Sequence, residues 1–125
     1  MNLPRFWKTL LCILFIFIIS AVPGQSVPDI PIWNFDKLVH SFIYFWLTFS
    51  LYYDLKSVRN FSGARYTFII WLAGPIAYGG LLEILQNFIF INRSGNWIDF
   101  WANTFGVIGA AVFVKSFKKT TRSSD

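Results

Sequence analysis

Charged residues are scarce in this sequence. They make up 14% of its 125 residues, while hydrophobic residues make up 55% and aromatic residues 21%. A soluble domain of this size has too small an interior to bury so much apolar surface. The composition therefore excludes an ordinary soluble globular domain and is typical of a membrane protein.

Cysteine and histidine are nearly absent, with one residue of each. The single cysteine, Cys12, excludes an intrachain disulfide framework. Leu11 stands before it, where a lipoprotein signal needs a small residue, so we expect Cys12 to be an ordinary packed side chain. With one histidine and no H-E-x-x-H motif, a metal site is the least favoured functional alternative, and we expect no cofactor.

Basic residues outnumber acidic ones, with eleven Lys and Arg against six Asp and Glu and a net charge of +5. They do not form a basic stripe on a soluble face, so the charge does not indicate nucleic-acid binding. They gather instead in short clusters at the ends of apolar segments. Such clusters are typical of the regions that flank membrane-spanning helices.

Four apolar segments approach the length of about 20 residues that a helix needs to cross a membrane. They cover about residues 6–22, 38–55, 66–91 and 99–117. A cleaved signal peptide is the alternative for the first segment, but Pro23 and the lack of an A-x-A pattern disfavour cleavage. The sequence therefore predicts an all-α fold, a four-helix transmembrane bundle that forms one domain over residues 1–125.

The distribution of Lys and Arg predicts the orientation of this bundle. Only Lys37 and Arg93 belong to the regions between the first and second segments and between the third and fourth. The other nine flank the opposite ends of the segments: Arg5, Lys8, Lys56, Arg59, Arg65, Lys115, Lys118, Lys119 and Arg122. Because cytoplasmic loops are enriched in Lys and Arg, we expect both termini and the middle loop to be cytoplasmic.

Polar residues interrupt the second apolar segment along one helical face. At 100° per residue, one stripe carries Lys37, His40, Ser41, Tyr44 and Thr48, while the opposite face is apolar and suited to lipid. We interpret Tyr44 and Thr48 as packing residues. We expect the whole stripe to face the other helices.

The third and fourth segments carry further polar residues. One face of the third segment carries Gly79, Glu83, Gln86 and Asn87. In the fourth segment Asp99 and Asn103 lie one turn apart, and small residues at positions 102, 106 and 110 continue their side, so another helix can approach closely. Glu83 is the deepest of these groups, about 12 Å below Ile91 at 1.5 Å per residue. We expect its partner to be Lys37, His40 or Arg93.

These residues predict a polar cluster in the outer half of the membrane. Its members are Asp36, Lys37, His40, Glu83, Gln86, Arg93, Asp99 and Asn103. Their formal charges sum to −1, or to zero if His40 is protonated, so the cluster can neutralise itself. That balance fits either a structural ion-pair network or a site that exchanges an internal partner for an anionic ligand. Asp36 and Asp99 also fit a simpler role as helix N-caps, and Arg93 one as a turn residue.

Three stretches together resemble the VanZ-like family of small bacterial multi-pass membrane proteins. They are FDKLVHSFIYFWL at 35–47, YGGLLEILQNF at 78–88 and NRSGNWIDFWANTFGVIGA at 92–110. The family pattern of Asp-Lys-x-x-His-x-x-x-Tyr, Glu-x-x-Gln, Arg and Asp-x-x-x-Asn-x-x-Gly is matched by Asp36, Lys37, His40, Tyr44, Glu83, Gln86, Arg93, Asp99, Asn103 and Gly106. The resemblance covers about residues 33–112. It departs from the family in Ser41 after His40 and in the missing Pro-Gly before Arg93.

The resemblance implies a single VanZ-like domain over residues 1–125 in the bacterial plasma membrane. It also implies a link to teicoplanin resistance, while the family has no settled biochemical activity. Membrane lipids are the expected partners, a lipid-linked cell-wall precursor or an envelope protein the further candidates, and a homo-oligomer remains open.

Three functions remain open for the predicted cluster. In the first, Lys37, His40 and Arg93 bind the phosphate of an envelope lipid at the outer leaflet, held in position by the carboxylates. In the second, Glu83 and His40 are the acid and base of an enzyme that acts on such a lipid, although no nucleophile is evident. In the third, the cluster is an internal ion-pair network of a structural or assembly protein.

Overall fold

The computed structural model describes residues 4–22, 35–57, 64–90 and 96–123. Within these ranges the chain forms four α-helices and no strand, which confirms the predicted all-α fold there. The helices are α1 (Trp7–Ala21), α2 (Phe35–Lys56), α3 (Ala64–Phe88) and α4 (Trp97–Ser123). Helix α4 extends to Ser123, beyond the predicted end at Phe117, because the polar residues that follow its apolar segment are also helical.

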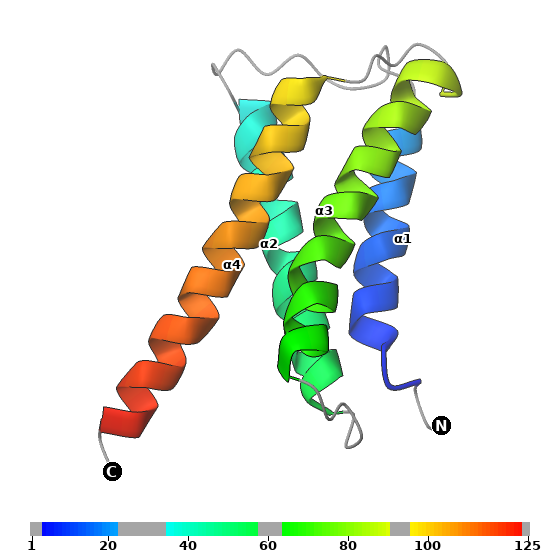
Figure 1. The fold of residues 1–125 in the computed structure, drawn as a ribbon. Coiled ribbons are helices and arrows are strands. Elements are labelled where there is room, and N and C mark those ends of the chain that lie inside the picture. Colours follow the sequence, from blue (N-terminus) through cyan, green and yellow to red (C-terminus); the bar gives the residue numbers. More distant parts are fainter. Residues whose placement is uncertain (1–3, 23–34, 58–63, 91–95, 124–125) are drawn as a thin grey trace.

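The helices run alternately up and down (Figure 1). At one end of the bundle α1 and α3 end and α2 and α4 begin, and we call this the site end. At the opposite end lie the start of α1 and the end of α4, and we call this the termini end.

The second helix is the centre of the fold, since its contacts with the other three helices are the most extensive, above all those with α4. The main core cluster joins Ile16 of α1, Tyr44 and Leu47 of α2, Leu82 of α3 and Val107 of α4. A second cluster, nearer the termini end, joins Leu55, Trp71 and Val114.

The predicted packing face of α2 is confirmed by its burial. Tyr44 is buried, and so is Thr48, whose hydroxyl donates a hydrogen bond to the Tyr44 carbonyl at 2.8 Å. The opposite face of the same helix, with Leu38, Phe42 and Trp46, is exposed. The polar stripe of the sequence is therefore the face that α2 turns toward its neighbours.

Helices α2 and α4 pack closely against each other at Gly106. A Cβ atom at this position would overlap the backbone carbonyl of Ser41, so only glycine fits. One turn away, the Ser41 hydroxyl donates a hydrogen bond to the Ala102 carbonyl at 2.8 Å. From this crossing α4 diverges from α2 toward the termini end (Figure 1).

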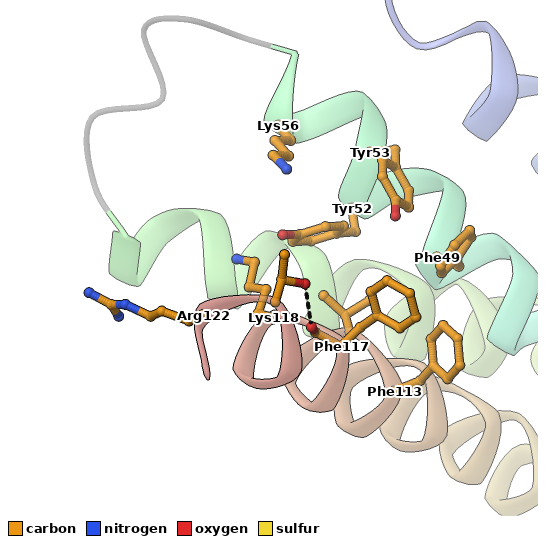
Figure 2. Close-up of a pocket in the computed structure, with 10 residues that line it drawn as sticks. Phe49, Tyr52, Tyr53, Lys56, Phe113, Phe117, Lys118 and Arg122 are labelled. Atoms are coloured by element: carbon orange, nitrogen blue, oxygen red, sulfur yellow. Dashed lines mark hydrogen bonds between the residues drawn. The ribbon is translucent and has the colours of Figure 1, made fainter. Parts of the chain in front are cut away.

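The divergence of α4 leaves a groove between α2 and α4 at the termini end (Figure 2). Its volume is about 650 Å³. Its walls carry aromatic side chains of both helices, with Phe49 on α2 and Phe113 on α4 as neighbours at 6.1 Å between ring centroids.

Two segments among the described residues are long and apolar enough to cross a membrane, Thr67–Phe88 and Trp97–Ser123. Helix α1 is apolar but shorter. Large apolar side chains remain exposed on all four helices, among them Leu14, Phe42, Leu81 and Phe105. The bundle thus hides only part of its apolar surface within itself.

Candidate functional site

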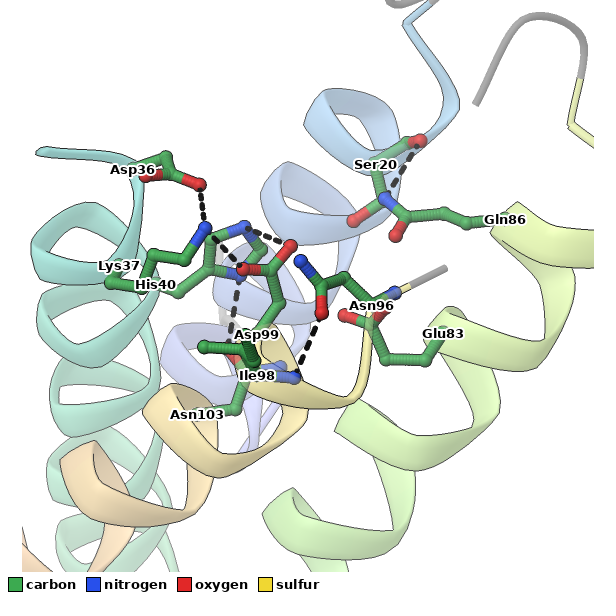
Figure 3. A network of polar contacts seen from close by, with 10 residues as sticks. All are labelled: Ser20, Asp36, Lys37, His40, Glu83, Gln86, Asn96, Ile98, Asp99 and Asn103. Carbon is green, nitrogen blue, oxygen red and sulfur yellow. Dashed lines mark hydrogen bonds and ion pairs between the residues drawn. The ribbon is translucent and has the colours of Figure 1, made fainter. Parts of the chain in front are cut away.

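Asp99 is the centre of the charged contacts at the site end (Figure 3). The Nζ atom of Lys37 lies 3.2 Å from its Oδ1 atom, in an ion pair between α2 and α4. Oδ1 of Asp99 takes part in this ion pair, but it accepts no hydrogen bond from the described part of the chain. Asp36 is on the other side of the ammonium and forms a second ion pair with it. Lys37 is thus held between two carboxylates from different helices.

The two carboxylates favour the charged form of Lys37, because each is an opposite charge in direct contact with its ammonium. This ammonium is the kind of fixed, partly exposed cation that binds a phosphate.

His40 connects the same two helices one turn deeper. Its Nδ1 atom lies 3.0 Å from Oδ1 of Asn103, and because an amide oxygen only accepts, Nδ1 is the donor. Its Nε2 atom is 4.0 Å from Oδ2 of Asp99, which is beyond hydrogen-bond distance. The imidazole is therefore held by one hydrogen bond and presents its other nitrogen toward a carboxylate.

Glu83 reaches the beginning of α4. Its Oε2 atom accepts a hydrogen bond from the backbone N–H of Asn96 at 2.7 Å. Helix N-termini carry unpaired N–H groups and a partial positive charge, so a carboxylate is stabilised there. Among the described contacts, the N-terminus of α4 thus stabilises this buried charge, whereas the ion pairs of Lys37 and of His40 go to other carboxylates.

Asn96 is the N-cap of α4. Its side-chain Oδ1 accepts a hydrogen bond from the N–H of Ile98 at 3.0 Å, as an N-cap does at the start of a helix. The N-cap alternative for Asp99 is therefore wrong, because Asp99 lies within the first turn, with its own N–H bonded to the Asn96 carbonyl. Asn96 was missed by the sequence reasoning, although Asn before an apolar helix is a recognisable capping signal.

Gln86 brings α1 into the site end. Its Nε2 atom donates to the carbonyl of Ser20 near the end of α1, at 3.3 Å. Gly79, Glu83 and Gln86 are all buried on one face of α3, as predicted, but Asn87 is exposed. Asn87 points away because it lies about 100° further round the helix than Gln86.

A small cavity lies between these groups. Its volume is about 40 Å³, enough for a water molecule. His40, Glu83, Asn103 and Ser20 line it from four different helices. A larger opening of about 200 Å³ adjoins Glu83 on its other side, between the end of α3 and Trp97. The two candidate catalytic residues, His40 and Glu83, thus line the same cavity.

Seven of the eight predicted cluster residues lie at the site end. Arg93, the eighth, is outside the described residues. No known family model, curated protein or solved structure matches the chain. The resemblance to the VanZ-like family therefore stays a prediction.

No set of three or more His, Cys, Asp or Glu side chains is placed to hold a metal ion in the part of the chain that the structure describes. The polar side chains at the site end form instead a lysine–carboxylate ion pair, Lys37–Asp99, and a histidine–amide hydrogen bond, His40–Asn103. Such an arrangement can bind an anion or transfer a proton.

A second buried carboxylate, Asp54, lies near the termini end and was missed from the sequence. Its Oδ2 atom accepts hydrogen bonds from the N–H of Thr9 at 3.0 Å and from the Thr9 hydroxyl at 2.7 Å. Its Oδ1 atom lies 3.3 Å from Nζ of Lys8. Asp54 thus accepts from the first turn of α1, as an anion at a helix N-terminus.

Proposed function

We propose that the chain is a VanZ-like, multi-pass protein of the bacterial plasma membrane, with four spanning helices and both termini in the cytoplasm. Exposed apolar side chains on all four helices support this, because lipid would cover them. The cluster of basic residues at the termini end supports the orientation. The site end then faces outward.

Cysteine labelling tests this topology. In a Cys12→Ser background, Ser26→Cys, between α1 and α2 in the sequence, should react with a membrane-impermeant reagent in intact spheroplasts. Ser57→Cys, at the end of α2, should react only after the cells are opened. The reverse pattern would place the site end in the cytoplasm. Recovery of the chain in the aqueous fraction would contradict the membrane location altogether.

For the site end, we propose that it binds the phosphate of an anionic envelope lipid at the outer leaflet, such as a lipid-linked cell-wall precursor. The observation that carries this is the position of Lys37, a charged ammonium between Asp36 and Asp99. Asp99 is in turn 4.0 Å from His40, which lines the small cavity with Glu83. A phosphate can replace Asp36 at the ammonium, because this carboxylate is 59% exposed and is not held by the bundle. Asp99, which is 16% exposed, keeps the lysine in place.

Lipids that co-purify with the protein provide the direct test. Mass spectrometry of the purified chain should show an enriched polyprenyl-phosphate species. Lys37→Gln should lose this species, while Thr48→Val, on the same helix but buried in the core, should keep it. Equal recovery of the species with both variants would overturn lipid binding at Lys37.

Teicoplanin tolerance is the expected phenotype, following the family resemblance. Expression in a susceptible Gram-positive host should raise tolerance. Glu83→Gln and Asp99→Asn should reduce it at unchanged membrane levels, since each removes a charge and keeps the shape. Full tolerance with both variants would favour a purely structural role of the carboxylates. No tolerance with the wild type would contradict the glycopeptide function.

An enzyme is the second candidate, favoured by one observation, the shared cavity of His40 and Glu83. A water molecule in this cavity would lie between His40 and Glu83, the candidate acid–base pair. Conversion of a polyprenyl-phosphate lipid by the purified chain, abolished by His40→Gln, would establish this activity. Binding of the lipid without its conversion would contradict the enzymatic activity and leave lipid recognition as the proposed function.

A further inference from the structure

The groove between α2 and α4 at the termini end combines an apolar wall with a basic rim (Figure 2). Phe49 of α2 and Phe113 and Phe117 of α4 form the wall, in contact with one another through their rings. Val114 is buried beneath them. The volume of about 650 Å³ falls in the range of sites for small molecules.

Three basic residues line this groove toward the termini end, and the Arg122 side chain extends outward from it (Figure 2). Lys56 comes from the end of α2, and Lys118 and Arg122 come from the last turns of α4. Among the described residues, no acidic side chain lines the groove. The nearest carboxylate on α2, Asp54, is buried and accepts its hydrogen bonds from α1. The groove therefore has a net positive mouth that no lining residue neutralises.

The two parts of the groove are arranged in a definite order along the helices. The aromatic wall lies toward the middle of the bundle, and the cations lie at the helix ends, where Tyr52 separates the two parts. Lys118 extends over the Tyr52 ring, with Nζ at 5.0 Å from its centroid, so its charged end is held near the mouth. An occupant thus needs a negative group at the termini end and an apolar part directed toward the bundle centre.

From this order we infer that the groove binds one anionic phospholipid of the leaflet at the termini end. The headgroup phosphate contacts Lys56, Lys118 and Arg122, and an acyl chain lies against Phe49, Phe113 and Phe117. The inference rests on the proposed membrane location but not on any function of the site end. A zwitterionic lipid fits the apolar wall but not the mouth, because its cationic group would meet three positive charges.

Native mass spectrometry of the full chain in detergent can test this inference. The probes are dioleoyl phosphatidylglycerol and dioleoyl phosphatidylcholine, which share their acyl chains and differ in headgroup charge. We expect a single bound phosphatidylglycerol at low lipid concentration and about tenfold weaker binding of phosphatidylcholine. Equal binding of the two lipids would overturn the role of the basic mouth.

Two triple variants with the same change of charge provide the matched comparison. The first is Lys56→Gln, Lys118→Gln and Arg122→Gln, in the groove. The second is Arg65→Gln, Lys115→Gln and Lys119→Gln, which are exposed and outside it. Each groove charge should account for about a fivefold change in affinity for an anionic headgroup. We therefore expect at least a tenfold loss with the first variant and less than a threefold loss with the second. Equal losses would mean that only the overall charge attracts the lipid, against the inference.

Phe113→Ala tests the apolar wall separately. It should weaken binding of both lipids by a similar factor and leave the preference for phosphatidylglycerol unchanged. Unchanged binding of both would overturn the acyl-chain placement. If a second copy of the chain occupies the groove instead, the wild type will be dimeric and the groove triple variant monomeric. A chain that stays in the aqueous fraction of cells would contradict the proposed membrane location, a different result from failure of lipid selectivity.

Discussion

Asp54 near the termini end and Asp99 at the site end are both carboxylates in a mostly apolar bundle, yet their surroundings differ. Asp54 has a fully buried side chain and accepts from three donors, all on the first turn of α1. Asp99 is 16% exposed and shares its charge with Lys37 and more distantly with His40. Asp54 thus joins two helices with all its described contacts made within the chain. Asp99 is less completely satisfied, because its Oδ1 atom accepts no hydrogen bond from the described residues.

Under the proposed function, Asp54 contributes to stability and Asp99 to ligand binding. A carboxylate that is fully satisfied by its own chain holds helices together and has nothing left to bind. A carboxylate that shares a lysine with a more exposed competitor can exchange that competitor for a ligand. Four substitution experiments test this difference between the two ends, in order from the largest expected effect on stability to the smallest.

Asp54→Ala should have the largest effect. It leaves the hydroxyl and N–H of Thr9 without their acceptor in a buried position, and we expect a loss of about 3 kcal/mol in the free energy of unfolding. Denaturation in mixed detergent micelles measures it. Asp36→Ala is the control at the other end and should change stability by less than about 0.5 kcal/mol, since that side chain is mostly exposed. Similar losses of stability for the two variants would contradict the difference between Asp54 and the carboxylates at the site end.

Gly106→Ala should come next, with a loss of about 2 kcal/mol from overpacking. Its Cβ would overlap the Ser41 carbonyl and force α2 and α4 apart. Gly74→Ala is the matched control in α3, where the nearest atom to the new Cβ is 4.0 Å away. That variant should be neutral or slightly stabilising, because alanine favours a helix more than glycine does. Equal stability of the two variants would contradict the close crossing.

The pair of Lys37 and Asp99 should show a measurable coupling. A double-mutant cycle with Lys37→Gln and Asp99→Asn should give about 1 kcal/mol, because both side chains are largely shielded. The cycle of Lys37 with Asp36 should give less than about 0.5 kcal/mol, as expected for an exposed partner. If the order of the two couplings is reversed, Asp36 rather than Asp99 holds the lysine, and a phosphate could not replace it as proposed.

Glu83→Gln should have the smallest effect on stability. The amide oxygen of glutamine can still accept the hydrogen bond from the Asn96 N–H, so we expect a loss below about 1 kcal/mol. Glu83→Leu removes the acceptor and should cost more, by about 1–3 kcal/mol. Thermal unfolding of both variants in detergent distinguishes them. Equal losses would mean that the negative charge, and not the hydrogen bond, is what the N-terminus of α4 stabilises.

The sequence predicted the helices well because their signal is local. Apolar runs and the helical period of α2 are properties of neighbouring residues, and the buried stripe through Tyr44 and Thr48 follows from them. Gly106 was also correctly placed on a close-packing face. Its contact with Ser41 depends on the approach of two helices, but a row of small residues on one face was sufficient to indicate it.

The partners of the charged residues were harder to predict because they depend on where helices end. The hydrogen bond that Glu83 accepts from the Asn96 backbone was not predicted, because it depends on α3 ending at Phe88 shortly before α4 begins. The expected pairing of Glu83 with Lys37, His40 or Arg93 stays a prediction, since Arg93 lies outside the described residues. Asp54 was not among the predicted site residues. Its donors are Lys8 and Thr9, 46 and 45 positions away in the sequence, and no local pattern reports such a contact.

The crossing at Gly106 divides α4 into arms of unequal length. From Trp97 to Gly106 the helix extends about 14 Å, and from Gly106 to Ser123 about 26 Å, at 1.5 Å per residue. If α4 tilts about its contact with the Ser41 carbonyl, the arm toward Ser123 is about twice as long as the arm toward Trp97. A tilt that moves Asp99 and its neighbours by a given distance would therefore displace the last turn of α4 by about twice as much, in the opposite direction. Such a tilt would also change the width of the groove between α2 and α4 at the termini end.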